Sequence, residues 1–350
     1  MENGNGTAIT ISGLSKAFGS VKAVDGLNLE VPDGSICALL GPSGCGKTTT
    51  LRLVAGFERP DDGSVQIGDR VVTGPSTFIP PERRRIGMVF QDYALFPHYD
   101  VAGNVAYALG RNRSAERVSE ILRLVGLEEI ADRRPDQLSG GQQQRIALAR
   151  ALAPTPEVIL LDEPFSNLDA ALRAEVRAET RQILRAANVT AVFVTHDQEE
   201  ALSLADTVAV MNDGLIEQVG TPEEVYGRPA TRWVANFLGD AEVLPGTVSA
   251  GQVECELARL SLNPGFEGPC DIVIRPESIA IAAAASGSRG DEHEGIVVDR
   301  EFYGHDQLVV VELPSGLRIR SRSAGFPAWH PGDRVRVWLD GPVNVMSPSQ

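Results

Sequence analysis

The chain has 350 residues, of which 43% are hydrophobic and 23% are charged, a balance typical of a globular protein with room for two domains. Its formal net charge is −15, which argues against nucleic acid as a partner because phosphate backbones are bound by basic surfaces. No apolar run approaches the roughly 20 residues of a membrane-spanning helix, and no basic, apolar leader is found at the N-terminus. We therefore expect a cytosolic protein that reaches a membrane only through a partner. The basic run 83–85 is expected to be a solvated turn.

Residues 1–240 are expected to form one α/β domain. Continuous apolar runs occur at residues 35–40, 158–161 and 191–195, as expected of parallel strands that are covered on both faces. Helical patterns follow these runs, so the predicted fold is α/β with a central sheet. A helical subdomain is expected as an insert over about residues 92–153.

Residues 241–350 have a different character. Short alternating runs at residues 295–299, 307–313 and 334–339 are separated by Gly, Pro and Ser turns, which predicts a small all-β barrel or sandwich. The segment 282–294 is rich in Ala, Ser and Gly, which predicts a mobile surface loop.

Residues 41–48 read Gly-Pro-Ser-Gly-Cys-Gly-Lys-Thr and match the phosphate-binding pattern G-x-x-x-x-G-K-[ST]. An apolar run precedes the motif and a helix-compatible stretch follows it, as the motif requires. The glycines let backbone N–H groups turn toward phosphate, and the helix N-terminus adds its dipole. Lys47 is predicted to reach the β- and γ-phosphates of ATP, and Thr48 to hold Mg²⁺. The predicted ATP-binding residues of this segment are Gly41, Pro42, Ser43, Gly44, Cys45, Gly46, Lys47, Thr48 and Thr49.

Two acidic residues, Asp162 and Glu163, end the apolar run 158–161. A buried strand that ends in carboxylates must aim them at something charged, because their desolvation is otherwise unsatisfied. Asp162 is the natural partner of Mg²⁺, and Glu163 is the natural base or polariser of the attacking water. Alone this pattern is weak, but together with the upstream phosphate loop it predicts a nucleotide-hydrolysing site.

A phosphate loop alone leaves kinases, GTPases, helicases and transporters open, and the segment 138–142 decides among them. It reads Leu-Ser-Gly-Gly-Gln and resembles the signature sequence of ABC ATPases, which have a P-loop NTPase fold with a helical subdomain. Ser139 is a candidate N-cap, and the glycines expose the N-terminus of a helix expected to run to residue 153. The resemblance implies a head-to-tail homodimer with two ATP molecules at its interface. In such a dimer the γ-phosphate of the opposite subunit is clasped by Ser139, Gly140, Gly141 and Gln142.

The remaining motifs follow the order of the ABC family over about residues 8–240. Gln91, after the expected strand 86–90, resembles the Q-loop glutamine, which contacts Mg²⁺ and the water. Residues 166–169 resemble the D-loop, which ends at Asp169, and His196 resembles the switch histidine that contacts the γ-phosphate. The resemblance thus implies that Glu163, His196 and Gln91 are catalytic, and that Thr48, Gln91 and Asp162 hold Mg²⁺.

Phe18 lies 23 residues before Gly41 and resembles the aromatic residue that stacks on adenine in ABC ATPases. A phenylalanine that simply belongs to the hydrophobic core is the alternative interpretation.

Among ABC proteins, the chain resembles the ATPase subunit of an importer. Exporters commonly fuse this domain to membrane helices, and soluble members that act on ribosomes or DNA usually carry two such domains or a long coiled coil. The resemblance implies two permease subunits or domains as partners, a substrate-binding protein as an indirect partner, and no nucleic acid. It places the chain at the cytoplasmic face of the cell membrane as a peripheral subunit. A soluble ABC ATPase acting on a macromolecular complex is the alternative from another class.

Residues 92–98 and the helix after Asp100 are expected to form the groove that receives the permease. The segment reads Asp-Tyr-Ala-Leu-Phe-Pro-His, and its aromatic and proline side chains suit an apolar docking site. A locally packed hydrophobic turn is the alternative interpretation.

The C-terminal region resembles the TOBE module, a small OB-like domain that follows the ATPase in importers of sugars, polyamines, ferric iron, thiamine and anions. The matching segments are 272–277, 302–306 and 332–338. Residues 91–98, 236–240 and 302–306 together look most like the ferric iron importers, so ferric iron is the predicted cargo, with the other importer substrates as alternatives. The histidines of this region, His293, His305 and His330, are unevenly spaced, so we interpret them as solvated side chains rather than a metal site.

Overall fold

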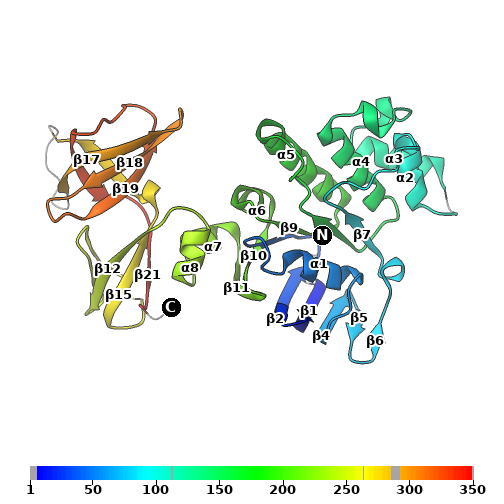
Figure 1. Cartoon of the computed structure of the whole chain (residues 1–350), viewed down its shortest axis with the longest axis horizontal. Helices are drawn as coiled ribbons and strands as arrows, with labels where there is room; N and C mark the ends of the chain where they lie inside the picture. The colour runs from blue at the N-terminus through cyan, green and yellow to red at the C-terminus, as the bar shows by residue number, and fades with distance from the viewer. Residues whose placement is uncertain (1–5, 112, 263, 285–291, 349–350) are drawn as a thin grey trace. The chain divides into compact units, whose positions relative to one another are not determined.

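The structure is a computed structural model that describes residues 6–111, 113–262, 264–284 and 292–348. It divides into an N-terminal unit (Met1–Pro222) and a C-terminal unit (Glu223–Gln350), each with a core of its own (Figure 1). The N-terminal unit is α/β and the C-terminal unit carries two β-sheets, which confirms the predicted fold class. Most of the loop expected over residues 282–294 lies outside the described residues.

The N-terminal unit is built on a six-stranded sheet with the order β11-β10-β3-β9-β8-β7. All neighbouring pairs are parallel except β10 and β11. Three of its strands, β3, β8 and β9, are buried along their whole length, which requires cover on both faces of the sheet. The strands are β3 (Ile36–Leu40), β7 (Ile86–Val89), β8 (Val158–Asp162), β9 (Thr190–Thr195), β10 (Thr207–Asn212) and β11 (Leu215–Gly220).

A second, antiparallel sheet of the N-terminal unit was not expected from the sequence. Its order is β2-β1-β4-β5-β6, and one of its faces is buried against helix α1 (Lys47–Ala55). Side chains of α1 share a single core with strands of both sheets, so the helix lies between them (Figure 1). The strands are β1 (Thr7–Phe18), β2 (Val21–Pro32), β4 (Asp62–Ile67), β5 (Arg70–Gly74) and β6 (Thr77–Phe78).

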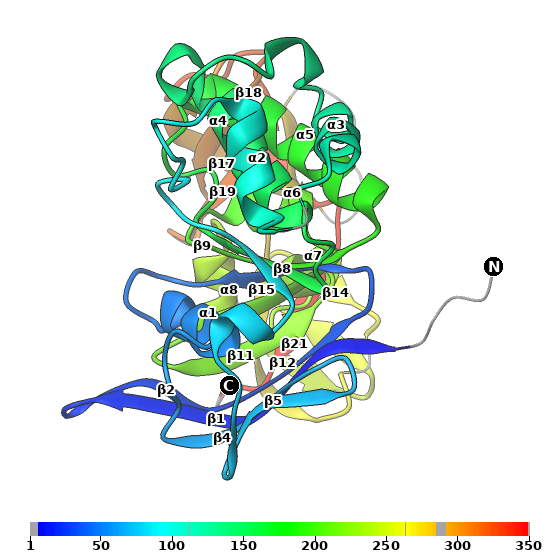
Figure 2. The same cartoon turned by 90° about the vertical axis from the view of Figure 1, so that its right-hand side faces the viewer.

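A helical subdomain covers the region expected from the sequence, and the described residues between 92 and 153 contain no strand. Its helices gather at the end of the unit remote from the antiparallel sheet (Figures 1 and 2). None of the helices in the described residues is both long and apolar enough to cross a membrane. The further helices of the unit are α2 (Val101–Ala108), α3 (Ala115–Leu124), α4 (Gly140–Leu152), α5 (Ala170–Ala187) and α6 (Gln198–Leu204), with 3-10 turns at Pro81–Arg83, Glu128–Ile130 and Pro135–Gln137.

The basic run 83–85 is not simply a solvated turn, because Arg84 is completely buried. Its guanidinium donates to the carbonyl oxygens of Leu53 and Val54 at the end of α1, at 3.0 and 2.8 Å. It also donates to the Ile79 carbonyl at 2.6 Å and to the Thr73 hydroxyl at 2.8 Å. The expectation was wrong because the isolated charge is solvated by backbone carbonyls, which the sequence does not reveal.

The C-terminal unit encloses one core between two five-stranded antiparallel sheets. Their orders are β14-β13-β12-β15-β21 and β16-β20-β17-β18-β19. The strands are β12 (Glu242–Ser249), β13 (Gln252–Glu254), β14 (Arg259–Leu260), β15 (Gly268–Ile274), β16 (Ile279–Ala283), β17 (His293–Phe302), β18 (Asp306–Glu312), β19 (Arg318–Ala324), β20 (Arg334–Leu339) and β21 (Val343–Met346), with a 3-10 turn at Pro276–Ser278.

The division between the two units falls at Pro222, earlier than the boundary expected at residue 240. Helices α7 (Pro222–Gly227) and α8 (Arg232–Phe237) fill the interval. One residue that joins this segment to the C-terminal unit is Arg275, which is 6% exposed and hydrogen-bonds to the segment and to the loop after it. It stacks on the Tyr226 ring, 4.1 Å from its centroid. The acceptors of its guanidinium are the carbonyl oxygens of Tyr226, Ala235, Gly239 and Asp240, at 2.8–3.3 Å.

We expect Arg275→Met to lower the free energy of unfolding of the C-terminal unit by roughly 2–4 kcal/mol, because buried carbonyls then lose their donor. Urea denaturation followed by tryptophan fluorescence measures this, since all three tryptophans of the chain lie in this unit. Arg259→Met, which removes only an exposed ion pair with Glu254, is the matched control and should cost less than about 0.5 kcal/mol. Equal stabilities of the two variants would contradict the anchoring role.

Candidate functional site

The predicted phosphate loop connects the end of β3 to the start of α1, and its glycines are required by packing. Gly46 has φ of +106°, and a Cβ there would lie 2.0 Å from the Ala23 carbonyl oxygen. A Cβ on Gly41 would lie 2.3 Å from the Met211 carbonyl oxygen. Both approaches are closer than a Cβ tolerates, so glycine at these two positions lets the loop pack against the backbone of β2 and β10.

Lys47 points back into this loop and is 5% exposed. Its ammonium donates to the carbonyl oxygens of Gly41 and Pro42 at 2.7 and 2.8 Å, with the Cys45 sulfur at 3.8 Å. These hydrogen-bonding partners are all neutral atoms, so the positive charge is held inside the loop without being cancelled there. A buried cation in a cradle that opens on a helix N-terminus is suited to bind an anion.

Thr48 and Asp162 bring two oxygen ligands together beside the loop. The Thr48 hydroxyl donates to Asp162 Oδ1 at 3.2 Å. Asp162 ends β8 and is 8% exposed. Burial raises the pKa of its carboxyl, against the opposing effects of the Thr48 hydrogen bond and of the nearby cations Arg52 and Lys47. A hydroxyl and a carboxylate side by side are ligands that Mg²⁺ prefers, so the donor set fits that ion.

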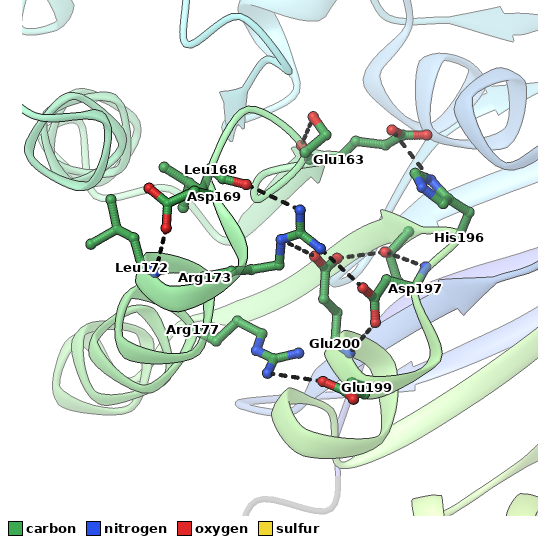
Figure 3. A network of polar contacts seen from close by, with 12 residues as sticks. Glu163, Leu168, Asp169, Leu172, Arg173, Arg177, His196, Asp197, Glu199 and Glu200 are labelled. Atoms are coloured by element: carbon green, nitrogen blue, oxygen red, sulfur yellow. Dashed lines mark hydrogen bonds and ion pairs between the residues drawn. The ribbon is translucent and has the colours of Figure 1, made fainter. Parts of the chain in front are cut away.

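Glu163 and His196 face each other at the neighbouring strand ends (Figure 3). Strands β8 and β9 are parallel, with Asp162 opposite Val194, so the residues that follow them lie close together. Glu163 Oε2 is 3.5 Å from His196 Nδ1, and Glu163 holds φ of +41°, which is uncommon for a residue with a side chain. His196 is 55% exposed at its side chain, so a substrate can reach this pair.

Gln91 and the segment 166–169 are joined by a hydrogen bond from a side chain to a backbone carbonyl. The Asn167 side-chain amide donates to the Gln91 carbonyl oxygen at 2.6 Å, and the Gln91 side chain is exposed. Asp169 is the N-cap of α5 and accepts from the Leu172 amide at 2.9 Å. These are the positions matched to the Q-loop and the D-loop, so the fold brings the two segments together.

The segment matched to the ABC signature forms the start of α4. Ser139 is the N-cap, and it exchanges hydrogen bonds with Gln142 in a capping box. A Cβ on Gly140 or Gly141 would lie within 3 Å of Leu168 or Val176, so both glycines allow the start of α4 to pack against α5 and the loop before it. The side-chain oxygens of Ser139 and Gln142 each accept from the backbone amide of the other residue, so these hydrogen bonds stay within the segment.

Phe18 lies at the end of β1 and is 50% exposed. The ammonium of Lys16 lies 5.4 Å from the centroid of its ring. A half-exposed ring at a strand end does not belong to the hydrophobic core, so the alternative interpretation of Phe18 as a core aromatic is wrong.

The segment 92–98 is fixed by two residues that the sequence did not single out. Arg150 of α4 donates to the carbonyl oxygens of Tyr93 and Ala94 at 2.8 and 2.5 Å. Asn104 of α2 is fully buried, and its side chain bonds to both the amide and the carbonyl of Phe96, at 2.9 and 3.2 Å. The position of Asn104 among apolar residues of α2 is the sequence feature that could have indicated its role.

The three histidines of the C-terminal unit have different surroundings. His305 and His330 have side chains that are 87% and 72% exposed, whereas His293 is within 3.0 Å of the Leu257 carbonyl oxygen. Across the ranges that the structure describes, no three His, Cys, Asp or Glu side chains are grouped so that they could hold a metal ion.

Both the N-terminal and the C-terminal unit match known protein families. Residues 24–166 match the ABC transporter family, and residues 272–343 match the TOBE domain. The Fe(3+) ions import ATP-binding protein FbpC 2 of Rhodococcus jostii is 46% identical over 342 residues, 95% of this chain and 97% of the relative. The chain belongs to the ABC transporter family. The Spermidine/putrescine import ATP-binding protein PotA of Marinobacter nauticus is 42% identical over 361 residues, 96% of this chain and 94% of the relative.

Solved structures share the fold of this ABC ATPase. A dimeric post-hydrolysis state of an ATP-binding cassette bound to ADP and Pi has a TM-score of 0.52 and 29% identity, and the match covers 61% of this chain and 98% of that one. The protein cbiO1 from Clostridium perfringens, part of the ABC transporter complex cbiONQ, has a TM-score of 0.58 and 28% identity over 63% of this chain and 90% of its own. The chain is therefore a transporter ATPase with a C-terminal TOBE domain.

The raised pKa of Asp162 predicts that its charge destabilises the nucleotide-free protein. An acid whose pKa is raised on folding is ionised in the unfolded state first, so stability falls as the pH rises through the carboxyl range and the loss persists at neutral pH. We expect Asp162→Asn to raise the melting temperature of the nucleotide-free protein at pH 7, by an amount that shrinks as the pH is lowered toward about 4. Scanning calorimetry measures both.

Asp169→Asn is the control for this prediction. It makes the same chemical change at the exposed N-cap of α5, where asparagine caps about as well as aspartate. It should leave the melting temperature nearly unchanged. A lower melting temperature for Asp162→Asn than for the native protein would show that the buried carboxylate is not a source of instability.

Proposed function

We propose that this ABC ATPase hydrolyses ATP in a homodimer that powers import through a membrane permease, and that its cargo is ferric iron. The observation that carries the proposal is the convergence at one edge of a single sheet. The caged ammonium of Lys47, the oxygen pair of Thr48 and Asp162, and the pair of Glu163 and His196 all lie there. Together they supply a phosphate-binding cation, metal ligands and groups that act on water.

The phosphate loop binds the nucleotide. Backbone N–H groups of the loop and the Lys47 ammonium hold the β- and γ-phosphates, and the exposed ring of Phe18 stacks on the adenine. Thr48, Asp162 and the Gln91 side chain would hold Mg²⁺. That ion neutralises charge on the phosphate oxygens when it is bound.

Hydrolysis uses the groups at the ends of β8 and β9. Glu163 accepts a proton from water, or polarises it, as the water oxygen attacks the γ-phosphorus. The bond between that phosphorus and the oxygen bridging to the β-phosphate breaks, and the electron pair leaves on ADP. His196 contacts the γ-phosphate and, through its 3.5 Å contact with Glu163, holds that carboxylate toward the reacting group.

A second copy completes each site in this proposal. The start of α4 exposes a helix N-terminus with small residues, which suits a phosphate bound by the opposite subunit. Closure and opening of the dimer are then passed through residues 91–98 to two permease subunits or domains. The ATPase would sit as a peripheral subunit at the cytoplasmic face of the membrane and meet the substrate-binding protein only indirectly.

Ferric iron is favoured as the cargo by the relatives. Among the relatives compared, several at 42–46% identity are named Fe(3+) ions import ATP-binding proteins. A polyamine importer is the second candidate, because relatives at 39–42% identity are named for spermidine and putrescine import. The ATPase itself does not contact the cargo in either case.

We expect Glu163→Gln to bind ATP and remain in a dimer, with turnover reduced by a factor of about a hundred or more, because the general base is lost. Phosphate release assays measure the turnover, and size-exclusion chromatography with ATP measures the dimer. Lys47→Ala should fail to bind ATP, whereas Glu157→Gln, which alters only a surface ion pair with Arg85, should behave like the native protein. Native turnover in Glu163→Gln would refute the assigned base.

Uptake measurements decide the cargo. In cells that lack the gene, uptake of radiolabelled ferric iron should fall and return with the native chain but not with Lys47→Ala. Uptake of labelled spermidine and of a labelled sugar should stay unchanged in the same cells. A loss of spermidine uptake with normal iron uptake would assign the chain to a polyamine importer instead.

A further inference from the structure

Arg173 of α5 joins two segments that lie far apart in the sequence (Figure 3). Its guanidinium donates to the Leu168 carbonyl oxygen at 3.0 Å, inside the segment 166–169. The same group contacts Asp197 Oδ2 at 3.4 Å and Glu200 Oε1 at 3.8 Å, and both residues follow His196 in the chain. One side chain therefore spans from the segment matched to the D-loop to the loop that carries the predicted switch histidine.

The loop around His196 is itself a closed set of hydrogen bonds. Thr195 donates from its hydroxyl to Glu200 Oε2 at 2.5 Å and accepts from the Asp197 amide at 3.0 Å. Asp197 caps α6 by accepting from the Glu200 amide at 3.1 Å. His196 lies between Thr195 and Asp197, so the position of its backbone is set by residues that depend on Arg173.

Two cations of α5 lie close enough to act on the buried Glu200 carboxyl. Its side chain is 5% exposed, and burial raises the pKa of its carboxyl, while the Thr195 hydrogen bond, Arg173 and Arg177 act in the opposite direction. Arg177 forms an ion pair with Glu199 at 3.6 Å, and the Glu199 side chain is 84% exposed. The two arginines thus supply the same charge to the same helix, but only Arg173 also reaches the segment 166–169.

We infer that Arg173 is a positioning residue for ATP hydrolysis, which fixes the loop of His196 to the segment 166–169 and thereby keeps His196 in register with Glu163. The inference rests on the proposed role of His196. Arg173 acts through that histidine and has no contact with the nucleotide in this scheme. Loss of the tie displaces His196 and Glu163 from the reacting phosphate without altering the phosphate loop.

The test is a comparison of Arg173→Gln and Arg173→Lys in steady-state ATPase assays with the full chain. Arg173→Gln should lower kcat by a factor of roughly 10–100, the effect of a small misplacement of catalytic groups, with KM for ATP unchanged within about twofold. Arg173→Lys should be intermediate, because lysine keeps the charge but cannot reach the carbonyl and both carboxylates at once. Melting temperatures of all variants are measured in parallel.

Arg177→Gln is the matched control, since it removes an arginine from the same face of α5 without touching Leu168 or Asp197. It should retain native kcat and KM. Native kcat in Arg173→Gln, an equal loss in Arg177→Gln, or a joint loss of kcat, nucleotide affinity and melting temperature would each overturn the positioning role.

His196→Ala separates this inference from the proposed function. Loss of hydrolysis in His196→Ala together with native turnover in Arg173→Gln would overturn the inference about Arg173 and leave the proposed function intact. Native turnover in His196→Ala would instead overturn the proposed role of the histidine, and with it the premise on which the role of Arg173 rests.

Discussion

Parallel pairing of β3, β9 and β8 is the constraint on which the rest of the site depends. Leu40 lies opposite Thr195, and Asp162 lies opposite Val194, so the three strands end at nearly the same level. Each strand is buried on both faces, which leaves its carboxyl end as the place where polar groups can emerge. Thr48 and Asp162, 114 positions apart along the chain, come within hydrogen-bonding reach because these registers hold, and Glu163 and His196 come together for the same reason.

Helix α1 is held at both ends, and this fixes the position of the phosphate loop at its start. At its start, Lys47 is bound inside the loop. At its end, Arg84 donates to the Leu53 and Val54 carbonyls, where a cation is also favoured by the helix dipole. Burial lowers the pKa of Arg84 to about 10, so the residue remains charged at neutral pH. The helix cannot slide between the two sheets without breaking one of these anchors.

The features that could be predicted from the sequence are the motifs that directly follow a buried strand. The phosphate loop, the pair Asp162 and Glu163, and His196 each follow a continuous apolar run, so their placement could be expected from the pattern of buried parallel strands. The antiparallel sheet could not, because the pairing of β1 with β2 shifts register at several points, and such shifts interrupt the alternation of apolar and polar residues.

Long side chains were the other part that the sequence did not reveal. Arg84, Arg150 and Arg275 all bind backbone carbonyls that lie well separated from them in the chain. A carbonyl acceptor has no sequence signature, because every residue carries one. The same holds for the attachment of residues 223–240 to the C-terminal unit, which includes hydrogen bonds from Arg275 to the carbonyl oxygens of Tyr226 and Ala235.

The site holds two buried charges whose hydrogen-bonding partners are neutral. Lys47 has neutral hydrogen-bonding partners, and Asp162 is buried with a hydroxyl as its hydrogen-bond donor. Burying such charges costs stability, and in the proposed function they lie where a polyphosphate and a divalent cation would supply further counter-charges. Nucleotide binding would offset both costs in that proposal, while Asn167 and Arg173 tie the surrounding loops together through hydrogen bonds to backbone carbonyls. In the proposed function, the approach of the second copy is then the step that completes the site.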